Sequence, residues 1–232
     1  MRPPWSSVSP MDALRVVAGP IAVVALSVVP ATAHADPPAT EQITAVAVGS
    51  QGQAVNGYHE TPPDGAVPVV NDCSTPSPSA LVADVYACSP SAAGAATCWP
   101  STPGSLLCVD NPWEHRLHRV AYVGQLPPVQ PTASPDPFAL LLDDGTRCLL
   151  RNGGSWGGRD DGYVGAYGCG KDFGSNPAVL CLPSQAQGSC IDRSGAAWTV
   201  KVGQLGAPGA HFPPPQTRAV TEAWFAGDRI PG

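Results

Sequence analysis

Hydrophobic residues in this chain occur in short runs bounded by glycine and proline. Residues 43–48 and 197–202 alternate apolar with polar or small side chains, which places the apolar ones on one face of a β-strand. Residues 67–70, 120–126 and 163–167 are further short runs that suit strands. Because 28 prolines and 25 glycines interrupt the sequence, we predict many short strands joined by turns and few long helices.

Turn sequences join several of these runs into hairpins. Residues 138–142 and 146–150 flank Asp-Asp-Gly, and an Asp-Gly pair between apolar runs favours a β-hairpin. Residues 97–99 and 106–109 flank a second, proline-containing turn. Two segments leave the element type open. The β-branched content of residues 79–88 favours a strand over a helix, and the C-terminal stretch 217–226 fits either a closing strand or a short helix.

The positions of the cysteines indicate an internal repeat. Residues 86–110 contain the motifs Y-x-C, C-W-P-S and C-V-D, and residues 167–192 contain Y-x-C, C-L-P-S and C-I-D in the same order. Each stretch is later followed by Val-Gly-Gln-Leu, at 123–126 and at 202–205. The repeat aligns three pairs of cysteines: Cys88 with Cys169, Cys98 with Cys181, and Cys108 with Cys190.

The chain has 8 cysteines, and an even number in a secreted chain indicates disulfides. A structural metal would need closely spaced ligands such as Cys-x-x-Cys, which the sequence lacks. Two pairs flank short turns and are expected to bond, Cys98 with Cys108 and Cys181 with Cys190. If the repeat is structural, the remaining bonds join Cys73 with Cys88 and Cys148 with Cys169.

Residues 1–35 have the features of a secretory signal peptide. Arg2 and Arg15 precede an apolar run at 16–29, and Ala-His-Ala at 33–35 forms a cleavage motif. The run is shorter than the roughly 18 residues that span a membrane, which favours cleavage over a retained anchor. Either Met1 or Met11 could initiate the chain. We therefore expect a secreted protein, extracellular or associated with the cell envelope, with no transmembrane segment in the mature chain.

The predicted fold class is mostly β: antiparallel and disulfide-rich, with two pseudo-repeated units packed as one body and little helix outside the signal peptide. A unit of about seventy residues rarely has enough core by itself, which is why the two should pack together. The expected organisation is a signal peptide at 1–35, a lead and first strand at 36–65, a β unit at 66–126, a proline-rich linker at 127–137, a second β unit at 138–205, and a C-terminal connector with a closing strand or short helix at 206–232.

One group of motifs carries a family resemblance: Phe-x-Leu-x-Leu-Asp-Asp-Gly-Thr-Arg-Cys at 138–148, Arg-Asn-Gly-Gly-Ser-Trp-Gly at 151–157, Arg-Asp-Asp-Gly at 159–162, Tyr-Gly-Cys at 167–169, and Trp-Thr-Val at 198–200. With the signal peptide, this region resembles exported proteins of mycobacteria and related actinobacteria that have no assigned activity. The resemblance implies secretion and the cysteine framework, and it transfers no functional residues.

Several motifs suggest chemistry but have plainer explanations. Residues 153–157 match the G-x-S-x-G elbow around Ser155, yet glycine-rich sequence follows where that elbow needs a helix. Two histidines within 114–118 lack a third metal ligand, so we expect a polar loop there. The acidic pairs at 143–144 and 160–161 lack calcium-loop spacing and fit turns. We therefore expect no catalytic residues, no metal and no cofactor, although a pair of carboxylates that act together stays possible.

The glycine-rich loop is the favoured place for ligand binding. Trp156 lies there beside charged groups, and aromatic faces next to hydrogen-bonding groups grip sugars or extended peptides in many sites. The binding candidates are Arg151, Ser155, Trp156, Arg159 and Asp160. For Trp156 itself, a ring that covers the core over a disulfide is favoured over a ligand contact, and Trp198, in an alternating run, is expected to be core.

These observations favour a secreted, non-enzymatic binding or interaction module whose partner is an envelope component or a protein. One alternative is an envelope hydrolase that uses Ser155 or a carboxylate pair, and another is a purely structural envelope protein. The formal net charge of −6 and the lack of a basic stripe argue against nucleic acid. The sequence specifies neither the ligand nor the oligomeric state.

Overall fold

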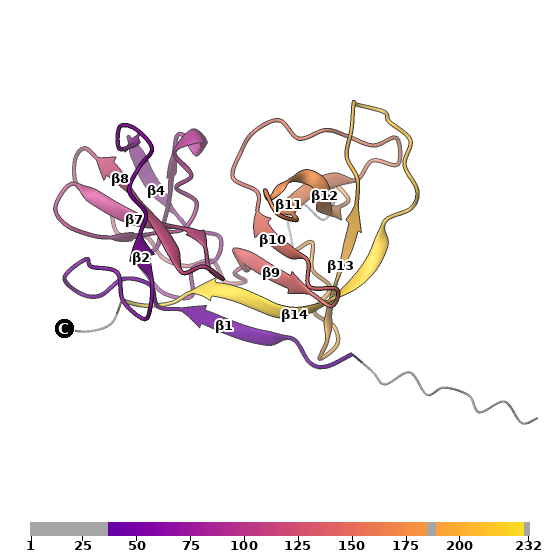
Figure 1. The fold of residues 1–232 in the computed structure, drawn as a ribbon, viewed down its shortest axis with the longest axis horizontal. Helices are drawn as coiled ribbons and strands as arrows, with labels where there is room; N and C mark the ends of the chain where they lie inside the picture. The colour runs from indigo at the N-terminus through magenta and orange to yellow at the C-terminus, as the bar shows by residue number, and fades with distance from the viewer. Residues whose placement is uncertain (1–36, 185–188, 230–232) are drawn as a thin grey trace, which may run out of the picture. The chain divides into compact units, whose positions relative to one another are not determined.

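The computed structural model describes residues 37–184 and 189–229, so the predicted signal peptide lies outside the described residues. Within the described residues the chain forms fourteen strands and one short 3-10 turn, η1 (Ser91–Ala93), and it contains no α-helix. Most strand pairs are antiparallel, and the strands form two sheets (Figure 1). The mostly β, antiparallel fold class predicted from the pattern is confirmed.

The first sheet has the strand order β2-β8-β7-β6-β5-β4, with β3 also paired to β8. Its strands are β2 (His59–Glu60), β3 (Val69–Val70), β4 (Asp72–Pro76), β5 (Tyr86–Ser89), β6 (Cys98–Pro100), β7 (Ser105–Asn111) and β8 (Arg116–Tyr122). A single residue separates β3 from β4. Because β3 pairs in parallel with β8 while β4 pairs with β5, the sheet curls back on itself.

The second sheet closes into a six-stranded barrel. Its strands are β9 (Ala139–Leu142), β10 (Arg147–Leu150), β11 (Val164–Cys169), β12 (Gly174–Cys181), β13 (Trp198–Gly203) and β14 (Gln216–Ala226). The long strand β14 pairs with β13 through its first half and with β9 further along, which completes the ring. Closure leaves no free edge among these six strands.

An N-terminal strand, β1 (Glu41–Ala45), extends the barrel sheet by pairing in parallel with β14. Figure 1 shows the two strands side by side, so the beginning and the end of the described chain meet. Residues 217–226 lie within β14, which settles the choice between strand and helix in favour of the strand. Since β1 and β14 come from opposite ends of the sequence, their pairing joins the two ends of the described chain outside the closed ring of six strands.

The two predicted hairpins are confirmed. In β6–β7, Cys98 faces Cys108, and in β9–β10 the Asp-Asp-Gly turn places Gly145 at a φ of +80°. Glycine adopts this left-handed conformation without the steric cost that a Cβ would bring. The apolar alternation on either side of a turn was sufficient to locate both hairpins.

The strand expected over residues 79–88 is wrong for most of its length. Only its end enters β5, at Tyr86, and the preceding residues form turns in which Asp84 has a φ of +61°. Ser77 is buried and its hydroxyl lies 2.9 Å from the hydroxyl of Thr97. The Ser77 hydroxyl also accepts a hydrogen bond from the Ser79 amide at 3.3 Å, and such local side-chain bonds favour a turn over an extended strand, which explains the difference.

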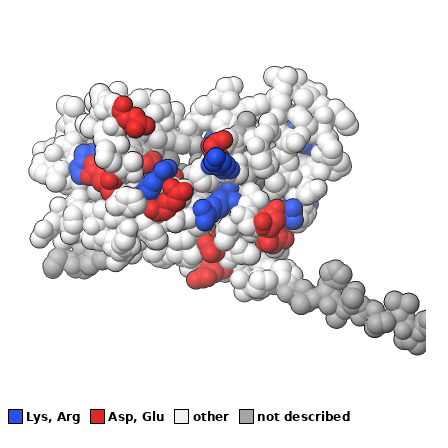
Figure 2. Space-filling model, viewed as in Figure 1, with Lys and Arg blue, Asp and Glu red and all other residues white. Residues whose placement is uncertain are grey.

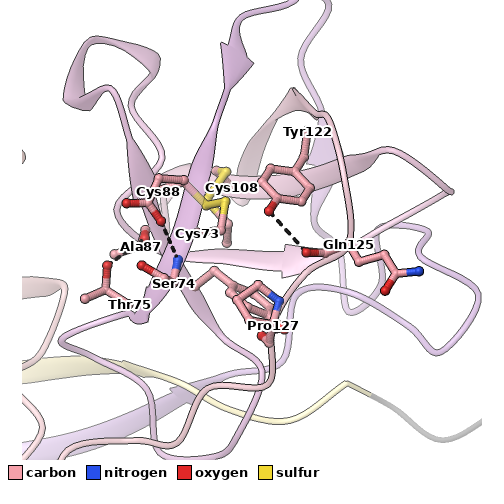
Figure 3. Close-up of a disulfide and its surroundings, with 12 residues drawn as sticks. Cys73, Ser74, Thr75, Ala87, Cys88, Cys108, Tyr122, Gln125 and Pro127 are labelled. Carbon is pink, nitrogen blue, oxygen red and sulfur yellow. Dashed lines mark hydrogen bonds between the residues drawn. A yellow bond between two sulfur atoms is a disulfide. The ribbon is translucent and has the colours of Figure 1, made fainter.

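All four expected disulfides are present: Cys73–Cys88, Cys98–Cys108, Cys148–Cys169 and Cys181–Cys190. Figure 3 shows the bond between Cys73 and Cys88, which joins β4 to β5 beside a hydrogen bond from the Thr75 hydroxyl to the Ala87 carbonyl, 3.3 Å long. The fourth bond differs from the expected hairpin. Cys181 ends β12 but Cys190 lies outside any strand, and residues 185–188 between them are outside the described residues.

The sheets share a hydrophobic core. Trp99 and Leu107 of the first sheet pack in one buried cluster with Phe138 and Ala139 of the barrel. The Trp99 indole also donates a hydrogen bond, 2.9 Å long, to the carbonyl of Gly227 after β14. The two parts therefore pack as one body, as expected.

In each sheet the last five strands lie side by side in the order in which they occur along the chain, β4 to β8 in the first sheet and β10 to β14 in the barrel. A disulfide joins the first two strands of each set, β4 with β5 and β10 with β11. The sheets close differently, however, because β3 meets β8 in parallel whereas β9 meets β14 antiparallel. The pseudo-symmetry of the sequence repeat and the domain boundaries drawn from it stay predictions.

Candidate functional site

The glycine-rich loop, defined as residues 151–162, connects β10 to β11 and is anchored by Arg159. The Arg159 side chain is completely buried and donates to the Asp161 carboxylate at 2.6 and 2.8 Å. It also donates to the carbonyls of Gln204 and Pro213, at 2.9 and 2.8 Å. The bond to Asp161 raises the pKa of Arg159. Because these donors are engaged inside the protein, Arg159 fixes the loop to the connector between β13 and β14.

Trp156 is half-buried and covers a small apolar cluster formed by Ala178, Leu180 and Leu205. Gly165 lies directly beneath the ring, where an added Cβ would lie 2.5 Å from Trp156 Cε3. The Arg151 guanidinium lies 5.1 Å from the ring centroid and donates to loop carbonyls. Trp156 therefore covers part of the core, and a portion of the ring remains at the surface for a ligand.

Ser155 is exposed, and the residues around it do not form a nucleophile elbow. Residues 150–170 contain no helix after the serine. The downstream histidine, His211, directs its Nδ1 at the Asp160 carboxylate, 2.7 Å away. In a serine hydrolase an aspartate at Nδ1 orients the histidine while its Nε2 accepts from the nucleophile hydroxyl. Among the described residues no hydrogen bond joins His211 to Ser155, so the second half of this arrangement is missing.

Two adjacent hollows lie beside residues 212–214, which follow His211 in the connector between β13 and β14. The first, of about 490 Å³, is lined by Asp160, Asp161, Tyr163, Lys201, His211, Phe212, Pro214 and Pro215. The second, of about 360 Å³, shares Phe212 and Pro214 and includes Gln204, Gln216 and Arg218. Both volumes lie in the range of small-ligand sites, which start at about 300 Å³. The glycine-rich loop contributes Asp160 and Asp161 to this surface.

The acidic pairs are engaged by cations. Hydrogen bonds from the Thr146 side chain and backbone, and the charge of Arg218 at 2.9 Å, lower the pKa of Asp144. Asp161 is held by Arg159, which lowers the pKa of Asp161. A general acid in glycoside hydrolysis needs a raised pKa, so these two carboxyl groups are unsuited to that role.

The histidines at 114–118 do not converge on one point. The expected polar loop is only partly right, because β8 begins at Arg116 and includes His118. The His118 ring lies between the Asp110 carboxylate, 2.6 Å from Nδ1, and the Ala93 carbonyl, 2.9 Å from Nε2. His115 instead meets Tyr58 edge to face at 4.8 Å. Within the described ranges, no three His, Cys, Asp or Glu side chains group as a metal site would require.

An aromatic cluster that sequence reasoning missed lies where the β7–β8 turn approaches the barrel. Trp113 stacks on Phe173 with centroids 6.1 Å apart and meets Trp224 edge to face at 6.3 Å. The Glu222 carboxylate accepts from both indoles, at 3.4 Å from Trp113 and 3.0 Å from Trp224. The Arg147 guanidinium lies 5.2 Å from the Trp113 centroid.

Next to this cluster is a hollow of about 430 Å³, which we call the Phe173 hollow; it is lined by Asn111, Glu114, Gly145, Thr146, Arg147, Gly170, Lys171 and Phe173. These residues come from three turns far apart in the sequence, so no single motif could reveal the site. The available clue was composition: Lys171 is one of two lysines in the sequence, and Trp113 follows a proline in a turn.

Comparison with known proteins finds no matching family model, no similar curated protein and no similar solved structure. In the part of the chain that the structure describes, no helix has the length and apolar character needed to cross a membrane. The fold and the disulfides therefore define the class on their own: a disulfide-stabilised, all-β protein.

Proposed function

We propose that this protein is a secreted binding module that recognises a component of the cell envelope or an extracellular partner and catalyses no reaction. The observation that carries the proposal is the glycine-rich loop, which presents Trp156 and Asp160 at the surface while buried Arg159 anchors it. A loop fixed before binding loses little conformational freedom when a ligand arrives, and this favours affinity.

The compartment follows from the disulfides together with the signal peptide predicted at 1–35. Disulfides persist in oxidising environments outside the cytoplasm. Four such bonds in one chain suit an extracellular location or the cell envelope. The resemblance to exported actinobacterial proteins supports an actinobacterial envelope as the first place to search for the partner.

The surface beside the loop favours a ligand with both apolar and hydrogen-bonding groups. Phe212 and the neighbouring prolines supply apolar contact, while Asp160, Lys201 and His211 supply donors and acceptors. Sugars and extended peptides combine these features. Because Lys201 already donates to the Thr217 hydroxyl at 2.7 Å, its ammonium group is held in position.

The experiment is retention of the oxidised protein on fractionated cell envelope. We expect Trp156→Ala to reduce retention several-fold, because a truncated aromatic anchor commonly costs more than about 1 kcal/mol of binding free energy. Tyr122→Ala is the matched control, since Tyr122 is a half-buried aromatic residue of the first sheet, away from the loop. Equal retention of the wild type and Trp156→Ala would contradict the proposed surface.

The hydrolase alternative is tested on the same preparation. Turnover of ester, glycan or peptide substrates that disappears in Ser155→Ala would replace the binding function with catalysis. A purely structural protein would show neither turnover nor saturable retention on any envelope fraction.

A further inference from the structure

We propose that the Phe173 hollow is a second binding site, separate from the glycine-rich loop, and that it takes a sugar carrying a carboxylate or a phosphate. Three features support this assignment: cations without a carboxylate partner, an aromatic ring at the wall, and a rigid backbone beneath both. Its volume of about 430 Å³ lies within the range of small-ligand sites.

The charge of the hollow favours an anion. Arg147 and Lys171 are exposed, and no described carboxylate forms an ion pair with either. By contrast, Arg119, Arg159 and Arg193 each hold a carboxylate within 2.7 Å. The one acid in the lining, Glu114, pairs with Arg116 at 3.4 Å. In an acidic chain, two cations left unpaired at one hollow attract a negatively charged group.

The geometry of Arg147 suits a carboxylate or phosphate. Within the described residues the Arg147 guanidinium forms no hydrogen bond or ion pair, and its Cζ lies over the Trp113 ring, 5.2 Å from the centroid. The N–H edges remain available for a bidentate pair of hydrogen bonds. Lys171 supplies a second positive charge from the facing turn.

The aromatic ring in the wall of the hollow is the reason to expect that the ligand contains a sugar. Phe173 lines the hollow and is backed by Trp113, stacked at an interplanar angle of 15°. Glu222 accepts from the Trp113 indole at 3.4 Å and so fixes the ring that supports the stack. A sugar ring has an apolar C–H face that packs on an aromatic ring, while its hydroxyls need polar neighbours such as Asn111 and Thr146.

The backbone of the hollow is rigid. The Cys148–Cys169 disulfide joins the residues next to Arg147 and Gly170, and the Gly170 amide donates to the Arg147 carbonyl at 2.9 Å. Phe173 has a φ of +49°, a conformation that a bulky residue keeps only when its surroundings impose it. In Figure 2, basic and acidic side chains lie interspersed across the middle of the face in view.

The test is equilibrium titration of the oxidised protein with trigalacturonate, glucose 6-phosphate and neutral maltotriose. We expect one or both acidic sugars to bind, maltotriose to bind at least tenfold more weakly, and affinity to fall as salt rises. Arg147→Gln and Lys171→Gln should each weaken binding by about tenfold, since each removes a charge-assisted contact.

Arg151→Gln is the matched control, because Arg151 makes the same guanidinium contact with Trp156, 5.1 Å from its centroid, on the glycine-rich loop. It and Trp156→Ala should leave acidic-sugar affinity unchanged, which separates this site from the proposed envelope-binding surface. Equal affinity for maltotriose, or unchanged affinity in the Arg147→Gln, Lys171→Gln double variant, would overturn the proposal. Inorganic phosphate that binds as tightly as glucose 6-phosphate would also overturn it, as would failure of both acidic sugars to bind.

Discussion

The first sheet and the barrel share a strand order and the placement of one disulfide between their first two meander strands, but they use their connections differently. The loop closed by Cys73 and Cys88 spans 15 positions, whereas the loop closed by Cys148 and Cys169 spans 21. The extra length in the barrel is the glycine-rich loop. The connector between β13 and β14, which contains the carbonyls that Arg159 grips, is also in the barrel.

This difference distinguishes the features that build both sheets from those that occur in the barrel alone. Apolar alternation, turns and disulfides build both sheets, and these features recur in each. The barrel in addition holds a buried arginine whose role is to fix a surface loop, and such an arginine is costly to bury unless every donor is satisfied. If the proposed binding function is right, the recognition surface lies on the barrel, and the first sheet contributes to binding only through the Phe173 hollow.

The largest expected effect is the loss of stability when the equivalent disulfide is removed from each sheet. Removing Cys148–Cys169 by a double alanine substitution should lower the free energy of unfolding by about 3 kcal/mol, and removing Cys73–Cys88 should cost a similar amount, because both bonds close loops of comparable length in the unfolded chain. Urea unfolding monitored by tryptophan fluorescence measures both. A cost below about 1 kcal/mol for one pair only would show that the two sheets do not depend on their disulfides alike.

The next largest effect is the loss of stability on replacing a buried arginine of the barrel, compared with a partly exposed arginine of the first sheet. Arg159→Gln should destabilise the barrel by about 2 kcal/mol, since it leaves buried carbonyls without donors. Arg119→Gln in the first sheet removes a similar bidentate contact with Glu60, but the Arg119 side chain is 26% exposed, so we expect a cost nearer 1 kcal/mol. Thermal and urea unfolding of the two variants should rank them in this order. The reverse ranking would remove the anchoring role of Arg159.

A smaller effect concerns pH and two histidine–aspartate pairs. Burial alone lowers the pKa of His118, but its hydrogen bond to Asp110, the Asp110 charge and the Ala93 carbonyl raise the pKa above its usual value. Both ring nitrogens face acceptors, which only the charged ring satisfies with two donors. The stability that this pair contributes is fully present below the unfolded pKa of about 6.5 and is lost as pH rises through the higher folded pKa.

His118→Gln should therefore flatten the dependence of unfolding free energy on pH above about 6.5, as followed by urea unfolding between pH 5 and about 8.5. His211→Gln is the matched control in the barrel, since His211 also faces an aspartate but its side chain is 87% exposed. A pH profile unchanged by His118→Gln would contradict the charged His118–Asp110 pair.

The sequence predicted the framework well because its determinants are local. The hairpins at Cys98–Cys108 and around Gly145 follow from alternation beside a turn. The bonds Cys98–Cys108 and Cys181–Cys190 follow from cysteines on either side of short turns, whereas the other two bonds were expected from the sequence repeat. The turns before Tyr86 were missed because short buried serines, whose hydrogen bonds depend on tertiary neighbours, replace the expected strand.

The candidate site was less predictable because its contacts join distant segments. Arg159 was grouped with exposed binding residues, but its partners at 204 and 213 are more than forty positions away. The Phe173 hollow joins turns around 111–114, 145–147 and 170–173, and the pairing of β1 with β14 joins the two ends of the chain. No local pattern encodes these encounters.

The most direct test of the account is hydrogen–deuterium exchange of the oxidised protein with and without the envelope fraction that retains it. We predict slower exchange on binding at residues 151–162 and in the connector 204–215, with the first-sheet strands β4 to β7 unchanged. Protection confined to the first sheet, or no protection in the glycine-rich loop, would contradict the barrel as the recognition surface.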